Sequence, residues 1–206
     1  MNSMNLTDWF ALLDESRRPW LEPAALKQKF LTRCGQTHPD RVHGAEAAEK
    51  ADATHAFAEL NAAYHGLAEP KSRLLHLVEL ERGAKPKDIQ TIPSALADIF
   101  AEVALTCRST DGFLTEKSQT TSPLVQVQLF ERGQEWTEKL SGLQQKLNGL
   151  HEQWLGELKA LDTAWVRKEA AQREELLAQL EELYRRFGYF NRWNRQIQER
   201  MVQLAI

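Results

Sequence analysis

The sequence predicts an all-α protein, and three observations support this fold class. Only 17 of the 206 residues are glycine or proline (10 and 7). Apolar residues recur at intervals of three and four along most of the chain, as in helices with one buried face. The alternation of apolar and polar residues that is typical of strands is nearly absent. With 42% hydrophobic residues, the chain can form one core of ordinary size and a second, smaller one.

Four helices are expected within residues 1–82. The first covers residues 7–14, where Thr7 or Asp8 can cap the free N–H groups. The second opens at Glu22 and Pro23, because proline is tolerated in the first turn of a helix. A third over residues 45–68 and a fourth over residues 71–82 follow. Their apolar faces predict that these helices pack together, with the stretch that contains His38, Pro39 and Asp40 in the loop between the second and third.

The remainder of the chain predicts a linker over residues 83–93 and a helical bundle over residues 94–206. Ser94 can cap a helix that extends to Cys107, and a Ser/Thr-rich loop is expected over residues 109–123. Two long rows of apolar residues with heptad spacing follow, Trp136 to Trp154 and Leu176 to Leu204. Asp162 and Thr163 offer a cap, so the break between two antiparallel helices is expected there. Together with the helix from Ser94 they form a three-helix bundle.

Composition and charge argue against several classes of protein. The net charge of −3 and the isoelectric point near 6.1 do not provide the basic field of a nucleic-acid-binding protein. Cys34 and Cys107 belong to no CxxC pair and are typical of a reducing compartment. No signal peptide and no apolar stretch of membrane-spanning length is recognisable. We therefore expect a cytoplasmic protein that binds neither nucleic acid nor membrane.

The loop between the second and third helices contains the tripeptide His38-Pro39-Asp40, followed by Arg41. Proline fixes its own φ and biases the preceding residue toward an extended backbone, so the loop is held in one shape. Asp40 offers a carboxylate acceptor, and the basic side chains of the preceding helix can steer an acidic partner. In this context the segment resembles a J domain, the module that docks on DnaK-class ATPase chaperones and stimulates their ATP hydrolysis. The resemblance implies a chaperone-binding site made of Lys29, Arg33, His38, Pro39, Asp40 and Arg41.

Three alternatives remain open for this region. The tripeptide can be a simple turn that ends a helix, and Lys29 with Arg33 can be a solvated helix face. A metal site made of Cys34, His38 and His43 has no recognisable fourth ligand, and Cys34 falls on the apolar stripe of its helix. We expect no metal and no cofactor. Because the sequence has no Gly-rich phosphate loop, HExxH motif or nucleophile elbow, we also expect no enzymatic activity.

A second resemblance narrows the family. The run ELNAAYHGLAEPKSRLLHLVELERG, residues 59–83, is similar to HscB, the J-type co-chaperone of iron-sulfur cluster assembly. The run ELYRRFGYFNRWNRQIQERM, residues 182–201, resembles its last helix. The resemblance implies an L-shaped protein whose C-terminal bundle binds the cluster scaffold protein. It also implies a client-binding face, although these side chains can instead fill the bundle core. The face would consist of Leu96, Ile99, Phe100, Val103 and Tyr189.

The sequence thus predicts a non-enzymatic co-chaperone, expected to be a monomer. Its partners would be a DnaK/HscA-class ATPase chaperone and a client, an iron-sulfur cluster scaffold protein. One alternative keeps the J domain with a different client. Another is a structural coiled-coil protein in which the tripeptide is incidental, and in that case the heptads can pair within one chain or between two.

Overall fold

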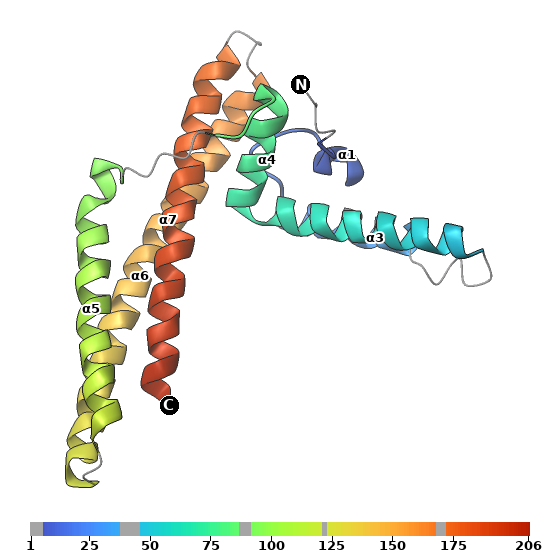
Figure 1. The fold of residues 1–206 in the computed structure, drawn as a ribbon. Helices are drawn as coiled ribbons and strands as arrows, with labels where there is room; N and C mark the ends of the chain where they lie inside the picture. Colours follow the sequence, from blue (N-terminus) through green and yellow to red (C-terminus); the bar gives the residue numbers. More distant parts are fainter. Residues whose placement is uncertain (1–5, 38–45, 87–91, 121–122, 168–171) are drawn as a thin grey trace. The chain divides into compact units, whose positions relative to one another are not determined.

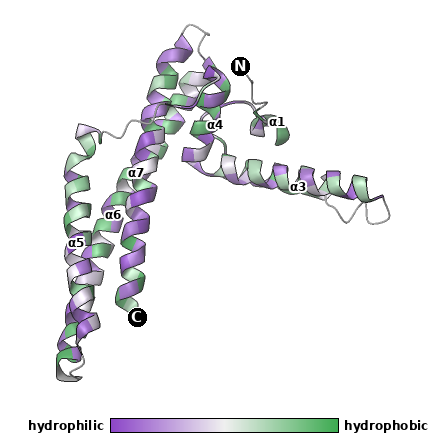
Figure 2. Cartoon of the chain, viewed as in Figure 1, coloured by the Kyte–Doolittle hydropathy of each residue, from purple (hydrophilic) through white to green (hydrophobic). Residues whose placement is uncertain are grey.

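The computed structural model describes residues 6–37, 46–86, 92–120, 123–167 and 172–206, and these residues form helices and no strand (Figure 1). The predicted all-α fold class is therefore confirmed. Figure 2 shows hydrophobic and hydrophilic residues mixed along the helices, as expected for helices that bury one face. The helices are α1 (Trp9–Leu12), α2 (Pro23–Thr37), α3 (Ala47–Ala68), α4 (Pro70–Arg82), the 3₁₀ turn η2 (Ser94–Leu96), α5 (Ala97–Gln119), α6 (Pro123–Arg167) and α7 (Arg173–Ala205).

The chain forms two compact units. Unit 1 combines Met1–Lys87 with Gly156–Arg185, and unit 2 combines Asp88–Leu155 with Arg186–Ile206. The long helices α6 and α7 therefore contribute residues to both units. The division of the chain into residues 1–82, 83–93 and 94–206 stays a prediction.

The first four helices of unit 1 follow the sequence pattern closely. The ring of Phe30 in α2 stacks on that of Tyr64 in α3, with centroids 4.2 Å apart. Asp8 caps α1, as expected, by accepting hydrogen bonds from the backbone N–H groups of Phe10 and Ala11. This helix is shorter than predicted, because the chain turns at Asp14, whose φ is +55°. α4 begins one residue earlier than expected, at Pro70, and ends at Arg82, because the following Gly83 caps it in the left-handed region.

The segment between α1 and α2 is anchored by two buried charged side chains. Arg73 of α4 is 2% exposed and donates to the carbonyl oxygens of Pro19, at 2.7 Å, and Leu67. Burial lowers the pKa of Arg73 to about 10. Asp162 of α6 is 4% exposed and accepts hydrogen bonds from the Arg18 guanidinium and the Trp20 backbone N–H. These contacts join residues far apart in sequence into one unit.

Asp162 also explains why the predicted break at Asp162-Thr163 is wrong. α6 continues through both residues to Arg167. The carboxylate of Asp162 does not cap a helix, because it is used by Arg18 and by the Trp20 N–H. Three residues further along, the Trp165 indole N–H donates to the Arg17 carbonyl oxygen at 2.9 Å. The end of α6 is therefore defined by its contacts with the α1–α2 connection.

In unit 2, α5, α6 and α7 pack against one another. Heptad residues of both predicted rows are buried within the chain: Leu140, Leu143, Leu147 and Trp154 from α6, and Phe187, Ile197 and Leu204 from α7. Asn194 fills an apolar slot of the second row, where its side-chain carbonyl accepts a hydrogen bond from Gln144 at 2.9 Å. The polar residue is thus satisfied within the bundle.

The Ser/Thr-rich loop predicted over residues 109–123 is wrong, since α5 continues through most of this segment to Gln119. Phe113 is 3% exposed, which gives the segment an apolar anchor. The hydroxyl of Thr110 donates to the carbonyl of Thr106, and that of Thr115 donates to the carbonyl of Asp111. Hydroxyl groups that bond back to the preceding turn are compatible with a helix, and here they do not end it.

Candidate functional site

The predicted chaperone-binding tripeptide falls between α2 and α3. His38, Pro39, Asp40 and Arg41 lie outside the described residues, as does His43. The structure places the flanking elements, since α2 ends at Thr37 and α3 begins at Ala47. The tripeptide thus directly follows a helix that is packed on its neighbour through Phe30 and Tyr64.

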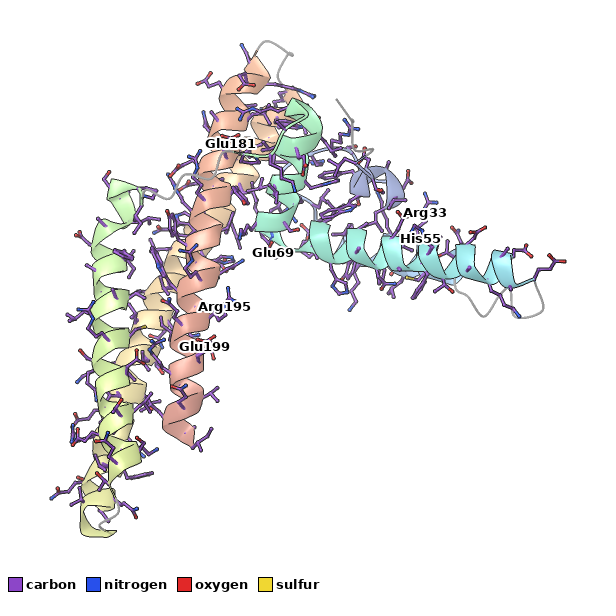
Figure 3. The ribbon with its side chains drawn as sticks, viewed as in Figure 1. Arg33, His55, Glu69, Glu181, Arg195 and Glu199 are labelled. Carbon is purple, nitrogen blue, oxygen red and sulfur yellow. The ribbon has the colours of Figure 1, made fainter. Side chains whose placement is uncertain are left out.

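The two basic residues predicted for this site have different surroundings. Lys29 is half-buried, and its ammonium group donates to the carbonyl oxygen of Asp14 at 2.6 Å and pairs with Glu15 at 3.1 Å. Lys29 therefore ties α2 to the end of α1. The side chain of Arg33 is exposed on α2 (Figure 3). Of the two cations, Arg33 is the one that is exposed on α2.

The exposed part of α2 also includes two residues that the sequence did not single out. Lys27 is exposed, and the side chain of Leu31 is 51% exposed although it is large and apolar. Leu31 precedes Arg33 by two positions and follows Lys27 by four. The buried residue of α2 is Leu26. Helical spacing places neither Lys27 nor Leu31 in the apolar row of Leu26, Phe30 and Cys34, so the sequence contained the signal that both are exposed.

A histidine in the core of unit 1 positions α1. His76 of α4 is 3% exposed, and its Nε2 atom accepts a hydrogen bond from the Trp9 backbone N–H at 3.1 Å. The indole of Trp9 stacks on the imidazole, with centroids 4.1 Å apart. Trp9 also lies directly over Gly66 of α3, which leaves no room for a side chain there. The α1 helix, which precedes the Lys29 partners Asp14 and Glu15, is thus fixed to both α3 and α4.

The residues of the predicted client-binding face divide into two groups. Leu96 and Val103 are 4% and 1% exposed and fill the core of unit 2. Ile99 and Tyr189 are half-buried, and Phe100 is 41% exposed. The alternative that these side chains are core residues therefore describes Leu96 and Val103, and it does not describe Phe100.

Trp193 joins the remaining members of this face and was missed from the sequence. Its ring centroid lies 5.4 Å from that of Tyr189, in a stacked arrangement, and 6.3 Å from that of Phe100. Trp193 itself is 2% exposed, so it serves as the floor on which the two other rings rest. The spacing of four between Tyr189 and Trp193 was the signal in the sequence. We call Ile99, Phe100, Tyr189 and Trp193 the aromatic face.

Charged residues of α5 flank the aromatic face. Asp98 is exposed, and Glu102 pairs with Lys146 of α6 at 2.5 Å. An apolar surface with carboxylates on one side is suited to binding another protein, because apolar contacts provide affinity and charges provide orientation. Nothing in this arrangement resembles a catalytic centre, since it contains no nucleophile paired with a base.

Among the described residues, no group of three or more His, Cys, Asp or Glu side chains is arranged to hold a metal ion. Two of the three residues of the alternative metal set, His38 and His43, lie outside that part of the chain. No helix in the described ranges has the length and apolar composition needed to cross a membrane.

Comparison with solved structures shows which known proteins have a similar fold. The chaperone HscB from Vibrio cholerae matches with a TM-score of 0.64 and 16% identity, over 96% of this chain and 99% of that one. The human co-chaperone HscB matches with a TM-score of 0.60 and 16% identity, over 94% of this chain and 82% of the other. None of the protein-family models matches the sequence, and neither does any curated protein. At this identity the similarity concerns the fold, and the chain shares the fold of these HscB chaperones over nearly its whole length.

Proposed function

We propose that the protein is a J-type co-chaperone that stimulates ATP hydrolysis by a DnaK/HscA-class chaperone and has no enzymatic activity of its own. The observation that carries this proposal is the coincidence of two independent features. The chain shares its fold with HscB chaperones over 96% of its length. Between α2 and α3 its sequence reads His38-Pro39-Asp40, the tripeptide by which it resembles a J domain.

The chaperone-binding site would combine the loop with the exposed part of α2. Arg33 provides an exposed cation near the loop, and Asp40 and His38 provide polar groups on a backbone that Pro39 restrains. Lys29 contributes indirectly, because its ammonium group is held by Asp14 and Glu15. Arg41 would extend the positive charge beyond the tripeptide.

The aromatic face would hold the client. Phe100 is the most exposed of its side chains, and Tyr189 and Trp193 provide stacked aromatic surface beside it. Aromatic side chains on a rigid base are typical of the central part of protein interfaces. The sequence resemblance to HscB implies an iron-sulfur cluster scaffold protein as this client. A J-type co-chaperone with another client uses the same two sites.

The coiled-coil alternative is less well supported. It requires the heptad rows to be available for pairing between chains, whereas Leu140, Leu147 and Ile197 are fully buried within unit 2. The rows are thus already occupied by intramolecular packing. A purely structural protein would also give no reason for the tripeptide.

Single-turnover ATP hydrolysis by a DnaK/HscA-class chaperone tests the proposal. We expect the wild-type protein to accelerate hydrolysis and the His38→Gln variant to have lost this effect. The matched control is His65→Gln, since His65 is an exposed histidine of α3 outside the loop, and this variant should stimulate like the wild type. If the wild type does not stimulate any chaperone of this class, the tripeptide is only a turn and the proposal is wrong.

Binding to a cluster scaffold protein tests the client. Phe100→Ala and Tyr189→Ala should each weaken binding about tenfold, the usual effect of removing an aromatic contact from the centre of an interface. The control is Leu105→Ala, because Leu105 lies on α5 but its 67% exposed side chain is outside the aromatic face. If the wild-type protein stimulates the chaperone but does not bind the scaffold protein, a co-chaperone with a different client is favoured.

A further inference from the structure

Leu31 of α2 is a large apolar side chain on the surface of unit 1. It is 51% exposed, whereas Leu26 of the same helix is 1% exposed and belongs to the core. No other large apolar side chain of helices α1 to α4, all of which the structure describes, is exposed. A single exposed leucine is common on protein surfaces, so the position of Leu31 in its helix decides what can be inferred from it.

Leu31 belongs to a row of exposed residues that leads to the loop after α2. Residues four positions apart lie one above the other on a helix, so Lys27, Leu31 and Gly35 form one row. All three are exposed. We call them the outer row of α2. The tripeptide that begins at His38 follows Gly35 by three positions, so the outer row ends beside the loop that the proposed function assigns to the chaperone.

The packing of the protein does not require the glycine of the outer row. At Gly66 of α3 a side chain would clash with the Trp9 ring, whereas a Cβ at Gly35 would have no atom of the described residues within 4 Å. Glycine also disfavours a helix relative to alanine. Gly149 of α6 is open in the same way, so openness alone is not a sign of a site. What distinguishes Gly35 is its place one turn after the exposed Leu31, where the backbone is open to a partner.

Leu31 and Gly35 together restrict the chemistry of a partner. An apolar side chain that lies against the backbone at Gly35 would also contact Leu31, and both would be removed from water. A charged or strongly polar group at the same place would lose its hydration without gaining a partner, because Leu31 has no hydrogen-bonding group. The complementary surface is therefore apolar opposite Leu31 and Gly35, and an acidic group fits only opposite Lys27.

Arg33, the exposed cation predicted for the chaperone site, does not belong to the outer row. It follows Leu31 by two positions, and a helix turns by about 100° per residue, so Arg33 projects from a different side of α2. A charge attracts a partner over about 8 Å at physiological ionic strength without touching it. Arg33 is thus suited to steering the chaperone toward α2, whereas the outer row is suited to contact with it.

We propose that the outer row of α2 determines which chaperone this protein accepts, through an apolar side chain of the chaperone that packs against Leu31 over Gly35. The inference rests on the proposed function, since it takes a DnaK/HscA-class chaperone as the partner. The row fits the chaperone and not the client because it ends beside the loop in unit 1, whereas the aromatic face belongs to unit 2. Chaperones of this class with a charged group at that point are rejected, because the charge would be buried unpaired.

Leu31→Lys tests the nature of the contact in single-turnover ATP hydrolysis by the chaperone. An apolar contact predicts that the co-chaperone concentration for half-maximal stimulation rises at least about tenfold, because the ammonium group has to be desolvated. Attraction to an acidic surface predicts the opposite, since the variant adds a cation. Leu31→Ala should raise this concentration about fivefold at both low and high salt, because salt does not screen an apolar contact. The matched control is Leu105→Lys, at an exposed leucine of α5 in unit 2, which should stimulate like the wild type.

Gly35→Ala separates chaperone binding from stability. The methyl group should favour the helix, so the urea midpoint should not fall. It also occupies the space beside Leu31, so the co-chaperone concentration for half-maximal stimulation should rise about fivefold. The matched control is Gly149→Ala, at a glycine of α6 that is equally open, which should keep full stimulation. Weaker stimulation by a protein that is no less stable cannot be explained by a structural role of Gly35.

The outcomes distinguish this inference from the proposed function. If the wild type stimulates a chaperone of this class and His38→Gln does not, but Leu31→Lys and Gly35→Ala stimulate as well as the wild type, only the inference about the outer row is wrong. A Leu31→Lys variant that stimulates better than the wild type overturns it as well. If the wild type stimulates no chaperone of this class, the proposed function and the inference are both wrong.

Discussion

The Nε2 atom of His76 accepts a hydrogen bond from the backbone N–H of Trp9, across 67 positions of the chain. The imidazole that accepts this bond is neutral, because a protonated ring has no free lone pair. Burial lowers the pKa of His76 below its ordinary value of 6.5; the charge of Asp8 opposes this shift and that of Arg17 adds to it. The attachment of α1 therefore depends on a histidine without charge.

We predict that the free energy of unfolding decreases as the pH falls below about 6.5. The unfolded chain takes up a proton on His76 near that pH, whereas the folded protein takes it up only at lower pH. The free energy that neutral His76 contributes to stability is fully present above pH 6.5. It decreases as the pH falls from 6.5 toward the lower pKa of His76 in the folded protein. Urea unfolding between about pH 7.5 and about pH 5 measures this decrease, which should be smaller in His76→Gln. An equal decrease in the variant would contradict the assignment.

Removal of the Asp162 carboxylate should destabilise the fold. Asp162→Ala leaves the Arg18 guanidinium and the Trp20 N–H without their acceptor, and we expect a loss of about 2 to 4 kcal/mol in the free energy of unfolding. Asp162→Asn should lose less, because the amide oxygen still accepts from Trp20. The control is Glu116→Ala, which breaks an exposed pair with Arg132 and should leave the urea midpoint nearly unchanged. If Asp162→Ala and Glu116→Ala lowered the free energy of unfolding by similar amounts, the burial of Asp162 would not explain its contribution to stability.

Two glycines in helices should respond in opposite ways to the same substitution. Gly35→Ala adds a methyl group to α2 with nothing within 4 Å of it, so the free energy of unfolding should rise by up to about 1 kcal/mol. Gly66→Ala makes its Cβ clash with the Trp9 ring and should lower that free energy by at least about 1 kcal/mol. Thermal and urea unfolding of both variants measure the difference. Stabilisation by Gly66→Ala would mean that Trp9 is not packed on α3.

Lys29 and Arg33 should differ in their effects on stability and on chaperone stimulation. Lys29→Ala removes the contacts with Asp14 and Glu15, so we expect it to lower stability more than Arg33→Ala does. If the proposed function is correct, Arg33→Ala should reduce chaperone stimulation more strongly, because Arg33 is exposed and Lys29 is held within unit 1. Unfolding and single-turnover hydrolysis of both variants give the two comparisons. A larger loss of stimulation in Lys29→Ala at unchanged stability would reverse the assignment.

Much of the fold could be predicted because local patterns determine it. Apolar spacing, the capping residue Asp8 and Pro23 in the first turn of the second helix placed the first four helices within a few residues. The wrong break at Asp162-Thr163 arose because a long-range contact overrides a local signal. Asp162 looked like a cap until its partners Arg18 and Trp20 were known, and such partners, more than 140 positions away, leave no trace in local periodicity.

The candidate sites were predictable to different degrees. The tripeptide is a sequence signal, and its position between two helices follows from their periodicity. Three residues of the aromatic face, Ile99, Phe100 and Tyr189, were predicted, but the buried Trp193 that contacts the rings of Phe100 and Tyr189 was not. Lys29 could not be separated from Arg33, since both lie on one side of α2 and the distinction depends on Glu15 and on the bend at Asp14.

The assignment of residues 156–185 to unit 1 limits how this chain can be divided. A fragment that ends near residue 86 would contain α1 to α4 but would lack Asp162 and Trp165, the acceptor for Arg18 and the donor to the Arg17 carbonyl. Such a fragment would lose these native contacts if it were transferred alone to another protein. Any chimera that keeps the native α1–α2 connection has to bring the adjoining ends of α6 and α7 with it.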